Sequence, residues 1–138
     1  MSITGTDADF IVKLIDVYSG DAPPNVAGVA MGGRQQLVRA EPFRGRYRNS
    51  FEYPMPFVPD ELAIIEFELP DIFHTWRRGH RLMVQLQSSY FPMIDRNPQN
   101  YVENIFTCDE EAFVKQSHRV FCGGGTFLEL PVLEGSLS

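Results

Sequence analysis

The sequence predicts an all-β fold made of antiparallel strands. At least six short stretches alternate between apolar and polar residues or are rich in β-branched and aromatic residues, and turns rich in proline and glycine separate them. One stretch alone carries a helix-start pattern. With 138 residues, 43% of them hydrophobic, the chain is long enough for one domain with a buried core. This pattern is typical of a β-sandwich, a jelly roll or a barrel, and alternation alone leaves the three open.

The first predicted strand, residues 7–18 (DADFIVKLIDVY), is apolar on both faces. One face carries Phe10, Val12 and Leu14, and the other carries Ile11, Ile15 and Val17. A strand that is apolar on both sides is covered on both sides, so we expect a central strand.

A loop follows at 19–28, where Pro23 and Pro24 exclude a helix. The stretches RQQLVRA and RGRYRNSF then predict two shorter strands around Pro42. In the second, three arginines share one face, which we expect to be solvated or salt-bridged: Arg44, Arg46 and Arg48.

The clearest alternation of the chain is at 61–70 (ELAIIEFELP), after an irregular stretch with three prolines. The predicted inner face carries Ala63, Ile65, Phe67 and Leu69, and the outer face carries Ile64, Glu66 and Glu68. After a connector at 71–80, the next strand is expected to point Leu82, Val84 and Leu86 inward.

The helix-start pattern lies at 107–116 (TCDEEAFVKQ). Thr107 and Glu110 have the spacing of a capping box, acids fill the first turn, and Lys115 lies near the end. This predicts one short helix. Two final strands are expected at 118–122 and 126–133, joined by three glycines.

Charge and composition argue against several classes of protein. Eighteen acidic against twelve basic residues give a net charge of −6, which disfavours binding to nucleic acid or to an anionic membrane. No run of 18 apolar residues and no signal-peptide pattern is present. The two cysteines, Cys108 and Cys122, lack zinc-ligand spacing, and no motif calls for a cofactor.

The sequence offers no recognisable catalytic motif. It has no G-x-S-x-G, and no motif joins His74, His80 or His118 to a serine or cysteine. Glu66 and Glu68 share a strand face, but a polar outer face explains them better than a glycosidase pair.

Metal binding is equally weakly indicated. Asp7 and Asp9 are too few for a calcium site, and we expect them to bond the backbone at the start of a strand. The histidines lack transition-metal spacing, and His80 is expected to be a packed or hydrogen-bonding residue.

Carbohydrate binding is the alternative function, from a different class. Six residues could form an aromatic platform with polar partners: Trp76, Tyr90, Phe91, Asp95, Asn97 and Asn100. Aromatic residues at a strand end more often close the open edge of a sandwich core, and we favour that structural interpretation.

The stretch GHRLMVQLQSSYFPMIDRNPQN (79–100) resembles the C-terminal domain of a family of serine hydrolases. That family includes X-Pro dipeptidyl-peptidase, cocaine esterase, glutaryl-7-aminocephalosporanic-acid acylase and the α-amino acid ester hydrolases, and the last branch looks most similar. Further blocks match in the same order, so the resemblance covers nearly the whole chain: residues 6–18, 43–52, 104–120 and 128–133.

The resemblance implies a jelly-roll sandwich similar to galactose-binding domains, spanning residues 1–138, beside a catalytic α/β-hydrolase domain that these residues do not contain. No catalytic residue is carried over, because the family's triad positions have no counterpart here. In the family the first strands of the sandwich precede residue 6, so we expect this chain to lack them. It would then be a segment of a longer chain, or a homo-oligomer formed through its exposed strands.

The loop at 88–100 is expected to be structural. Our hypothesis is that Asp95 and Arg96 make charge-assisted hydrogen bonds at the sandwich edge, beside Asn97, while Tyr90 and Phe91 cap the core. The same loop is a candidate contact with the catalytic domain. No catalytic, cofactor or metal-binding residue is predicted in the chain.

Overall fold

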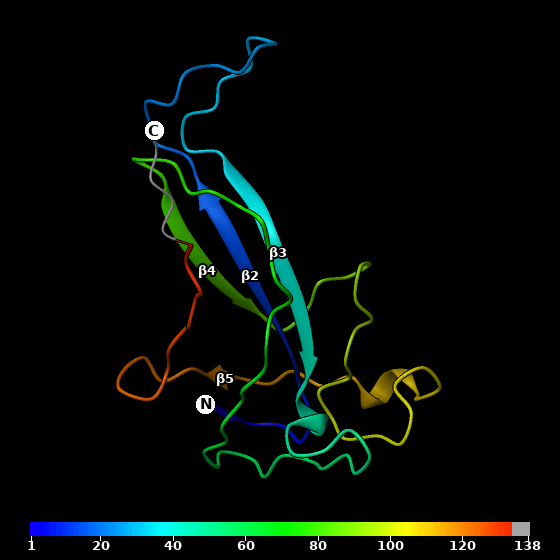
Figure 1. Cartoon of the computed structure of the whole chain (residues 1–138). Coiled ribbons are helices and arrows are strands. Elements are labelled where there is room, and N and C mark those ends of the chain that lie inside the picture. Colours follow the sequence, from blue (N-terminus) through cyan, green and yellow to red (C-terminus); the bar gives the residue numbers. More distant parts are fainter. Residues whose placement is uncertain (134–138) are drawn as a thin grey trace.

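The computed structural model describes residues 1–133 and shows an all-β, antiparallel fold (Figure 1). The larger sheet has the strand order β3-β2-β4, and a second, two-stranded sheet pairs β1 with β5. The elements are β1 (Ser2–Ile3), β2 (Asp9–Val17), β3 (Gln35–Arg44), η1 (Gly45–Tyr47), β4 (Arg81–Gln87), η2 (Glu110–Ala112) and β5 (His118–Arg119).

Strand β2 is the central strand, as the sequence predicts. It pairs antiparallel with β3 on one side and with β4 on the other. Ile11 is 0% exposed and Leu14 is 2% exposed, although they point to opposite faces of the sheet. Both faces of this strand are therefore covered.

Strand β3 is longer than predicted, and the second predicted strand after it is wrong. A single strand passes through Pro42 and ends at Arg44, after which the chain turns into the 3-10 helix η1. Proline is tolerated there because β3 lies at the edge of the sheet. The turn begins where the amide of Gly45 donates to the carbonyl oxygen of Ala8, at 2.9 Å.

Residues 61–70 are extended but form no strand in the described chain, which corrects the prediction. The predicted alternation is confirmed: Ile64 is 81% exposed, while Ala63 and Ile65 are half-buried against the core. Ala63 exchanges two backbone hydrogen bonds with Met1, at 2.7 and 2.8 Å. A β-strand is recognised by a series of backbone hydrogen bonds to a neighbouring strand. Within residues 1–133 this segment makes such bonds only at its first residues.

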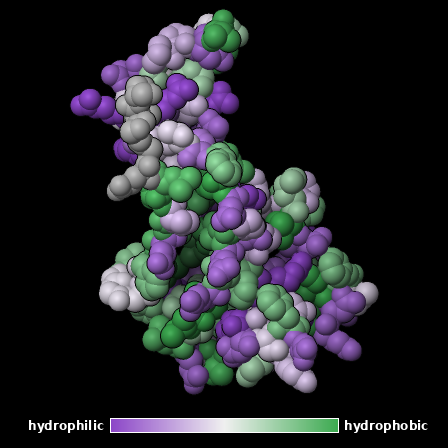
Figure 2. All heavy atoms as spheres, viewed as in Figure 1, coloured by the Kyte–Doolittle hydropathy of each residue, from purple (hydrophilic) through white to green (hydrophobic). Residues whose placement is uncertain are grey.

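The apolar residues of β4 are less buried than predicted. Leu82, Val84 and Leu86 are 40%, 49% and 43% exposed. Residues 61–75 run along the β3 side of the sheet (Figure 1), and within residues 1–133 nothing covers the β4 side to the same extent. Figure 2 shows green, apolar side chains around a hollow in the middle of the molecule.

The predicted helix at 107–116 is reduced to the single turn η2, and its N-cap is Asp109, with no side-chain cap bond. Beyond the turn the chain is extended: the backbone amide of Val114 donates to the carbonyl of Pro98, and the side-chain amide of Gln116 donates to that of Asp7. Hydrogen bonds to distant segments stabilise the extended conformation more than a short helix, which is only marginally stable by itself. The final strands are also shorter than predicted: β5 has two residues, and 126–133 form no strand.

The best-packed part of the core lies at the N-terminal end of β2. Phe10 is 1% exposed and meets Phe57 edge to face, with ring centroids 6.2 Å apart. Ile3 and Ala8 complete this cluster. No helix in residues 1–133 is long and apolar enough to cross a bilayer.

Candidate functional site

Two buried carboxylates lie at the start of β2. Asp7 is 0% exposed and Asp9 is 2% exposed. Asp7 Oδ1 accepts a hydrogen bond from the amide of Ala8 at 2.9 Å, which is the strand-start role expected from the sequence. The other carboxylate oxygens bind arginine and asparagine side chains from later in the chain.

Arg46 makes the shortest of these contacts. Its Nε and a terminal nitrogen donate to Asp7 Oδ2 at 2.9 and 2.6 Å, and the arginine is only 6% exposed. Its guanidinium also lies 4.6 Å from the ring centre of Tyr101. Of the three predicted arginines, Arg44 and Arg46 are salt-bridged as expected, whereas Arg48 donates to backbone carbonyls. They do not share one strand face, because β3 ends at Arg44 and Arg46 belongs to η1.

Asp9 has two partners of different kinds. Arg44 donates to its Oδ2 at 3.2 Å, and Asn97 donates to its Oδ1 at 2.9 Å. Burial raises the pKa of Asp9, and the bond from Asn97 and the charge of Arg44 oppose that rise. We call these five residues, Asp7, Asp9, Arg44, Arg46 and Asn97, the carboxylate network.

Asn97 connects the loop at 88–100 to this network. It is 7% exposed, and its Oδ1 accepts the backbone amide of Gln99 at 2.7 Å. Gln99 has a φ of 65°, a left-handed conformation that is uncommon for residues with a side chain. The neighbouring Pro98 is fully buried, and its carbonyl accepts from Val114.

The other predicted residues of the loop lie further out. Asp95 is 60% exposed and 3.7 Å from Arg44, while the Arg96 guanidinium lies 5.7 and 5.4 Å from the ring centres of Phe91 and Phe113. Phe91 is 65% exposed, so it does not cap the core in the expected way.

Tyr90 packs on the sheet itself. The ammonium of Lys13 on β2 lies 3.4 Å from the centre of its ring. Among the predicted residues, therefore, Asn97 and Tyr90 reach back to β2, and Asp95 reaches the end of β3.

A second carboxylate cluster, at the other end of β2, was not predicted from the sequence. His74 Nε2 and His80 Nδ1 each lie 2.9 Å from an oxygen of Asp16, which is 2% exposed. His80 also packs on the ring of Tyr18, with centroids 4.4 Å apart, and so is the packed, hydrogen-bonding residue expected. The spacing in sequence between residues 16, 74 and 80 carries no motif, and only the fold brings them together.

Neither a catalytic pair nor a sugar platform is assembled in the described residues. No histidine hydrogen bonds to a serine or cysteine there, and no three metal-ligating side chains gather. Trp76 meets His74 edge-on, and within residues 1–133 no aromatic pair joins it to Tyr90 or Phe91. Trp76, Tyr90 and Asn97 instead contact three different partners, which are His74, Lys13 and Asp9.

Known proteins resemble the chain in sequence and in structure. Residues 1–127 match the family described as the X-Pro dipeptidyl-peptidase C-terminal non-catalytic domain. Cocaine esterase from Rhodococcus sp. (strain MB1 Bresler) is 31% identical over 97 residues, which is 70% of this chain and 15% of the esterase.

Two solved structures are similar to the fold. An α-amino acid ester hydrolase labelled with selenomethionine has a TM-score of 0.76 and 45% identity, over 83% of this chain and 18% of that one. An aminopeptidase from the marine sediment archaeon Thaumarchaeota archaeon has the same TM-score and coverage with 46% identity. The chain therefore spans less than a fifth of the length of these relatives. Because the family match covers nearly all of the sequence, the chain belongs to the family of X-Pro dipeptidyl-peptidase C-terminal non-catalytic domains.

Proposed function

We propose that the chain is the supporting β-sandwich of a longer serine hydrolase that cleaves acyl esters or amides. Relatives described as an esterase, an ester hydrolase and an aminopeptidase support this substrate class. In such an enzyme a serine attacks the acyl group and an acyl-enzyme forms, in a catalytic α/β-hydrolase domain outside these residues. The role of this chain is to pack against that domain and support its active-site wall.

The observation that carries the proposal is the carboxylate network. Its charged groups face one another at 2.6 to 3.2 Å in the core, and they hold together segments far apart in sequence. Asn97 adds the loop after β4, and Gln116 adds the segment before β5 through the carbonyl of Asp7. Four of its five residues are at most 7% exposed, so their polar groups are engaged with one another and not with solvent.

Within this proposal the loop at 88–100 is a clamp with an inner and an outer part. The inner part is Asn97 and Pro98, both buried against the network. The outer part presents Phe91 and Arg96, which are exposed, with the guanidinium 5.7 Å from the ring centre. Exposed arginine and aromatic side chains are enriched in protein interfaces, so we place the catalytic domain on this side of the loop.

Hydrolysis of an activated ester tests the proposal. The purified chain should release p-nitrophenol from p-nitrophenyl acetate no faster than an equal concentration of free histidine, because within residues 1–133 no histidine hydrogen bonds to a serine or cysteine. A longer polypeptide that includes the α/β-hydrolase domain should turn over the same ester with saturation kinetics. Saturable turnover by the 138-residue chain, lost on treatment with a serine-reactive phosphonate, would refute the supporting role.

We further propose that the isolated chain self-associates. Leu62, Ile64 and Phe73 are 73%, 81% and 101% exposed, on a segment whose backbone is largely unpaired. Extended edges with apolar side chains favour pairing between copies. Light scattering coupled to size exclusion should give at least the mass of a dimer, and a monomer of 15.7 kDa at micromolar concentration would contradict this.

A further inference from the structure

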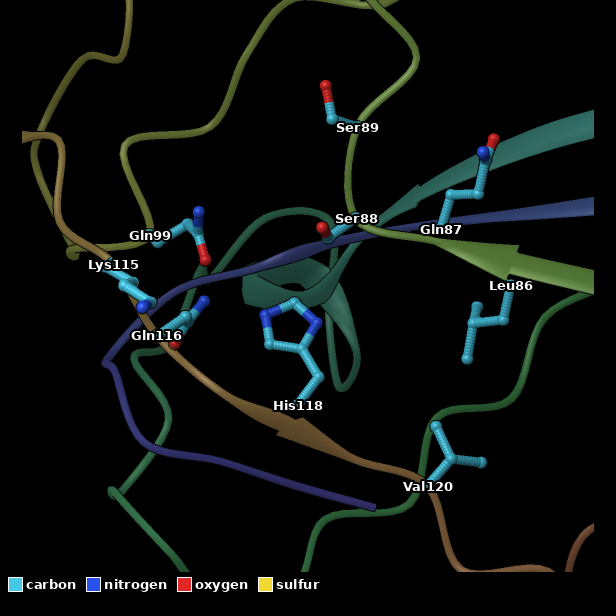
Figure 3. A pocket seen from close by; sticks show the side chains of 9 residues that line it. All are labelled: Leu86, Gln87, Ser88, Ser89, Gln99, Lys115, Gln116, His118 and Val120. Carbon is cyan, nitrogen blue, oxygen red and sulfur yellow. The ribbon is translucent and has the colours of Figure 1, made fainter.

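Two cavities lie at opposite ends of β4. The larger, of about 590 Å³, is lined by Ser88, Gln99 and His118 among others (Figure 3), and the open edges of β4 and β5 border it. Further strands of the sandwich are expected to cover these edges, so this cavity carries no separate site.

The smaller cavity, of about 400 Å³, lies beside the start of β4, where the loop after β2 meets the connector before β4. Most of the residues around it are polar or charged, and they come from these two segments alone: Ser19, Asp21, Ala22, Pro23, Arg77, Arg78, Gly79 and His80.

Backbone hydrogen bonds order both walls of the smaller cavity. In the connector, the amide of His80 donates to the carbonyl of Arg77 at 3.0 Å, and Gly79 has a φ of 84°, so these residues form a tight turn. In the loop, the carbonyl of Ser19 accepts from the amide of Gly33 at 3.1 Å. The backbone around the cavity is therefore in place before a ligand binds, which lowers the entropic cost of binding.

The imidazole of His80 brings one unpaired nitrogen to this cavity. Its side chain is 8% exposed, and its Nδ1 lies 2.9 Å from the buried carboxylate of Asp16. The carboxylate is an acceptor, so Nδ1 carries the hydrogen, and in the neutral ring Nε2 is then an acceptor. No group in residues 1–133 hydrogen bonds to this Nε2. A ligand in the cavity therefore meets a fixed acceptor.

Two arginines give the same cavity a positive charge. Arg77 and Arg78 are neighbours in the turn, and in the described part of the chain neither guanidinium pairs with a carboxylate. The acid that lines the cavity is Asp21, whose pKa is lowered by the hydrogen bond from the hydroxyl of Ser19. Two arginines against one aspartate leave an excess of positive charge, and guanidinium groups with available donors bind oxyanions.

We propose that this cavity binds a hydrogen phosphate ion. The arginines donate to its charged oxygens, and its P–O–H group donates to Nε2 of His80. Sulfate has a similar shape and charge, but at neutral pH it carries no hydrogen to offer to the neutral imidazole. The inference is independent of the proposed function, because every residue that lines the cavity belongs to this chain.

Isothermal titration calorimetry of the 138-residue chain tests the ligand. Sodium phosphate at pH 7.5 should bind saturably at one site, with a dissociation constant of about 1 mM. Sodium sulfate at the same ionic strength should bind about tenfold more weakly, because it leaves Nε2 of His80 without a donor. No saturable binding of phosphate, or equal binding of the two anions, would overturn the proposal.

Three variants with the same change of charge locate the site. Arg77→Gln and Arg78→Gln should each weaken phosphate binding about tenfold, because each removes a charge-assisted hydrogen bond. The control Arg81→Gln alters the first residue of β4, which is exposed and outside the cavity, and its affinity should stay within about twofold of the unaltered chain. All three side chains are exposed, so folding is preserved. Equal weakening in all three variants would reduce the effect to overall charge and overturn the assignment.

Nitrogen-15 NMR of the histidine rings tests the acceptor without altering it. Saturating phosphate should shift the Nε2 resonance of His80, whereas the ring of His118, in the larger cavity at the other end of β4, should not respond. Binding of phosphate with no shift at His80 would overturn its assignment as the acceptor.

Discussion

The buried carboxylates at the two ends of β2 are paired with different kinds of side chain. At its start, Asp7 and Asp9 bind Arg46, Arg44 and Asn97; at its end, Asp16 binds two histidines. In both places a nearly inaccessible carboxylate holds segments that are far away in sequence. The start uses guanidinium groups that keep their charge, whereas the end uses imidazoles whose hydrogen bonds depend on tautomer.

The difference between arginine and histidine partners affects how firmly each end of β2 is bound. An arginine offers several donors in a fixed plane, so Arg46 satisfies Asp7 and still stacks on Tyr101. A histidine offers one donor to the carboxylate, so Asp16 needs two of them, His74 and His80, to fill both oxygens. The start of β2 is thus the more strongly bound end.

The largest effect is expected at the start of β2. Arg46→Met keeps the apolar stem but removes the ion-pair partner of the buried Asp7 carboxylate, which should lower the free energy of unfolding by about 3 to 5 kcal/mol. Urea denaturation followed by circular dichroism measures this. The control Arg119→Met breaks an exposed pair with Asp60 and should cost at most about 1 kcal/mol. Similar losses in the two variants would contradict the ranking.

A smaller effect is expected at the end of β2. Asp16→Asn keeps one acceptor oxygen, so one histidine loses its partner, and stability should fall by about 1 to 3 kcal/mol. Amide hydrogen exchange should quicken in residues 71–80, which the two histidines tie to the sheet. Asp21→Asn, in an exposed loop, is the matched control and should leave exchange in that connector unchanged. A larger loss for Asp16→Asn than for Arg46→Met would reverse the comparison.

The clamp should depend on its buried residue more than on its charged ones. Asn97→Ala removes the bonds to Asp9 and to the amide of Gln99, for a loss of about 1 to 2 kcal/mol. Asp95→Ala removes a long contact to Arg44 at an exposed position and should change stability by at most about 0.5 kcal/mol. Thermal melting of the two variants side by side tests this. Equal shifts in the melting temperature would mean that the surface charges matter as much as the buried amide.

The smallest effect concerns pH. Burial lowers the pKa of His118 below 6.5, so the unfolded chain binds a proton more readily than the folded one. Stability should therefore decrease as pH falls from about 6.5 toward the folded pKa. The raised pKa of Asp9 acts in the opposite sense, and adds stability as pH falls further toward 3.8.

Urea unfolding at pH 7.5 and 5.5 measures the histidine effect. The free energies of unfolding at the two pH values should differ less in His118→Asn than in the unaltered chain. Asp9 is unaltered in that variant and serves as an internal reference. An unchanged pH dependence in His118→Asn would show that burial of His118 has no energetic consequence.

Alternation and composition predicted the fold class and the central position of β2, because a strand apolar on both faces has one physical explanation. They failed for residues 61–70 and 107–116. The first segment has the strand pattern but pairs with Met1 at its start alone, and the second has the helix pattern but is drawn out by bonds to Pro98 and Asp7. The pattern of one segment gives no information on which distant segments compete for its hydrogen bonds.

The candidate site was predicted in part for the same reason. Proline and amide content marked the loop at 88–100, and Asn97 was among the residues named. Its partner, Asp9, lies 88 positions away, and the cluster of Asp16 with His74 and His80 spans 64 positions. Contacts of such sequence separation leave no periodic signal, so they required the folded structure.

Gly45 sets a limit on how the start of β2 can be altered. A Cβ atom at this position would lie 2.6 Å from the ring of Phe57 and 2.8 Å from the carbonyl oxygen of Ala8. Any larger residue would push the turn off the core and carry Arg46 away from Asp7. Redesign of this domain as a fusion module should therefore leave residue 45 untouched and introduce changes on the outward side of the sheet, where added volume meets solvent.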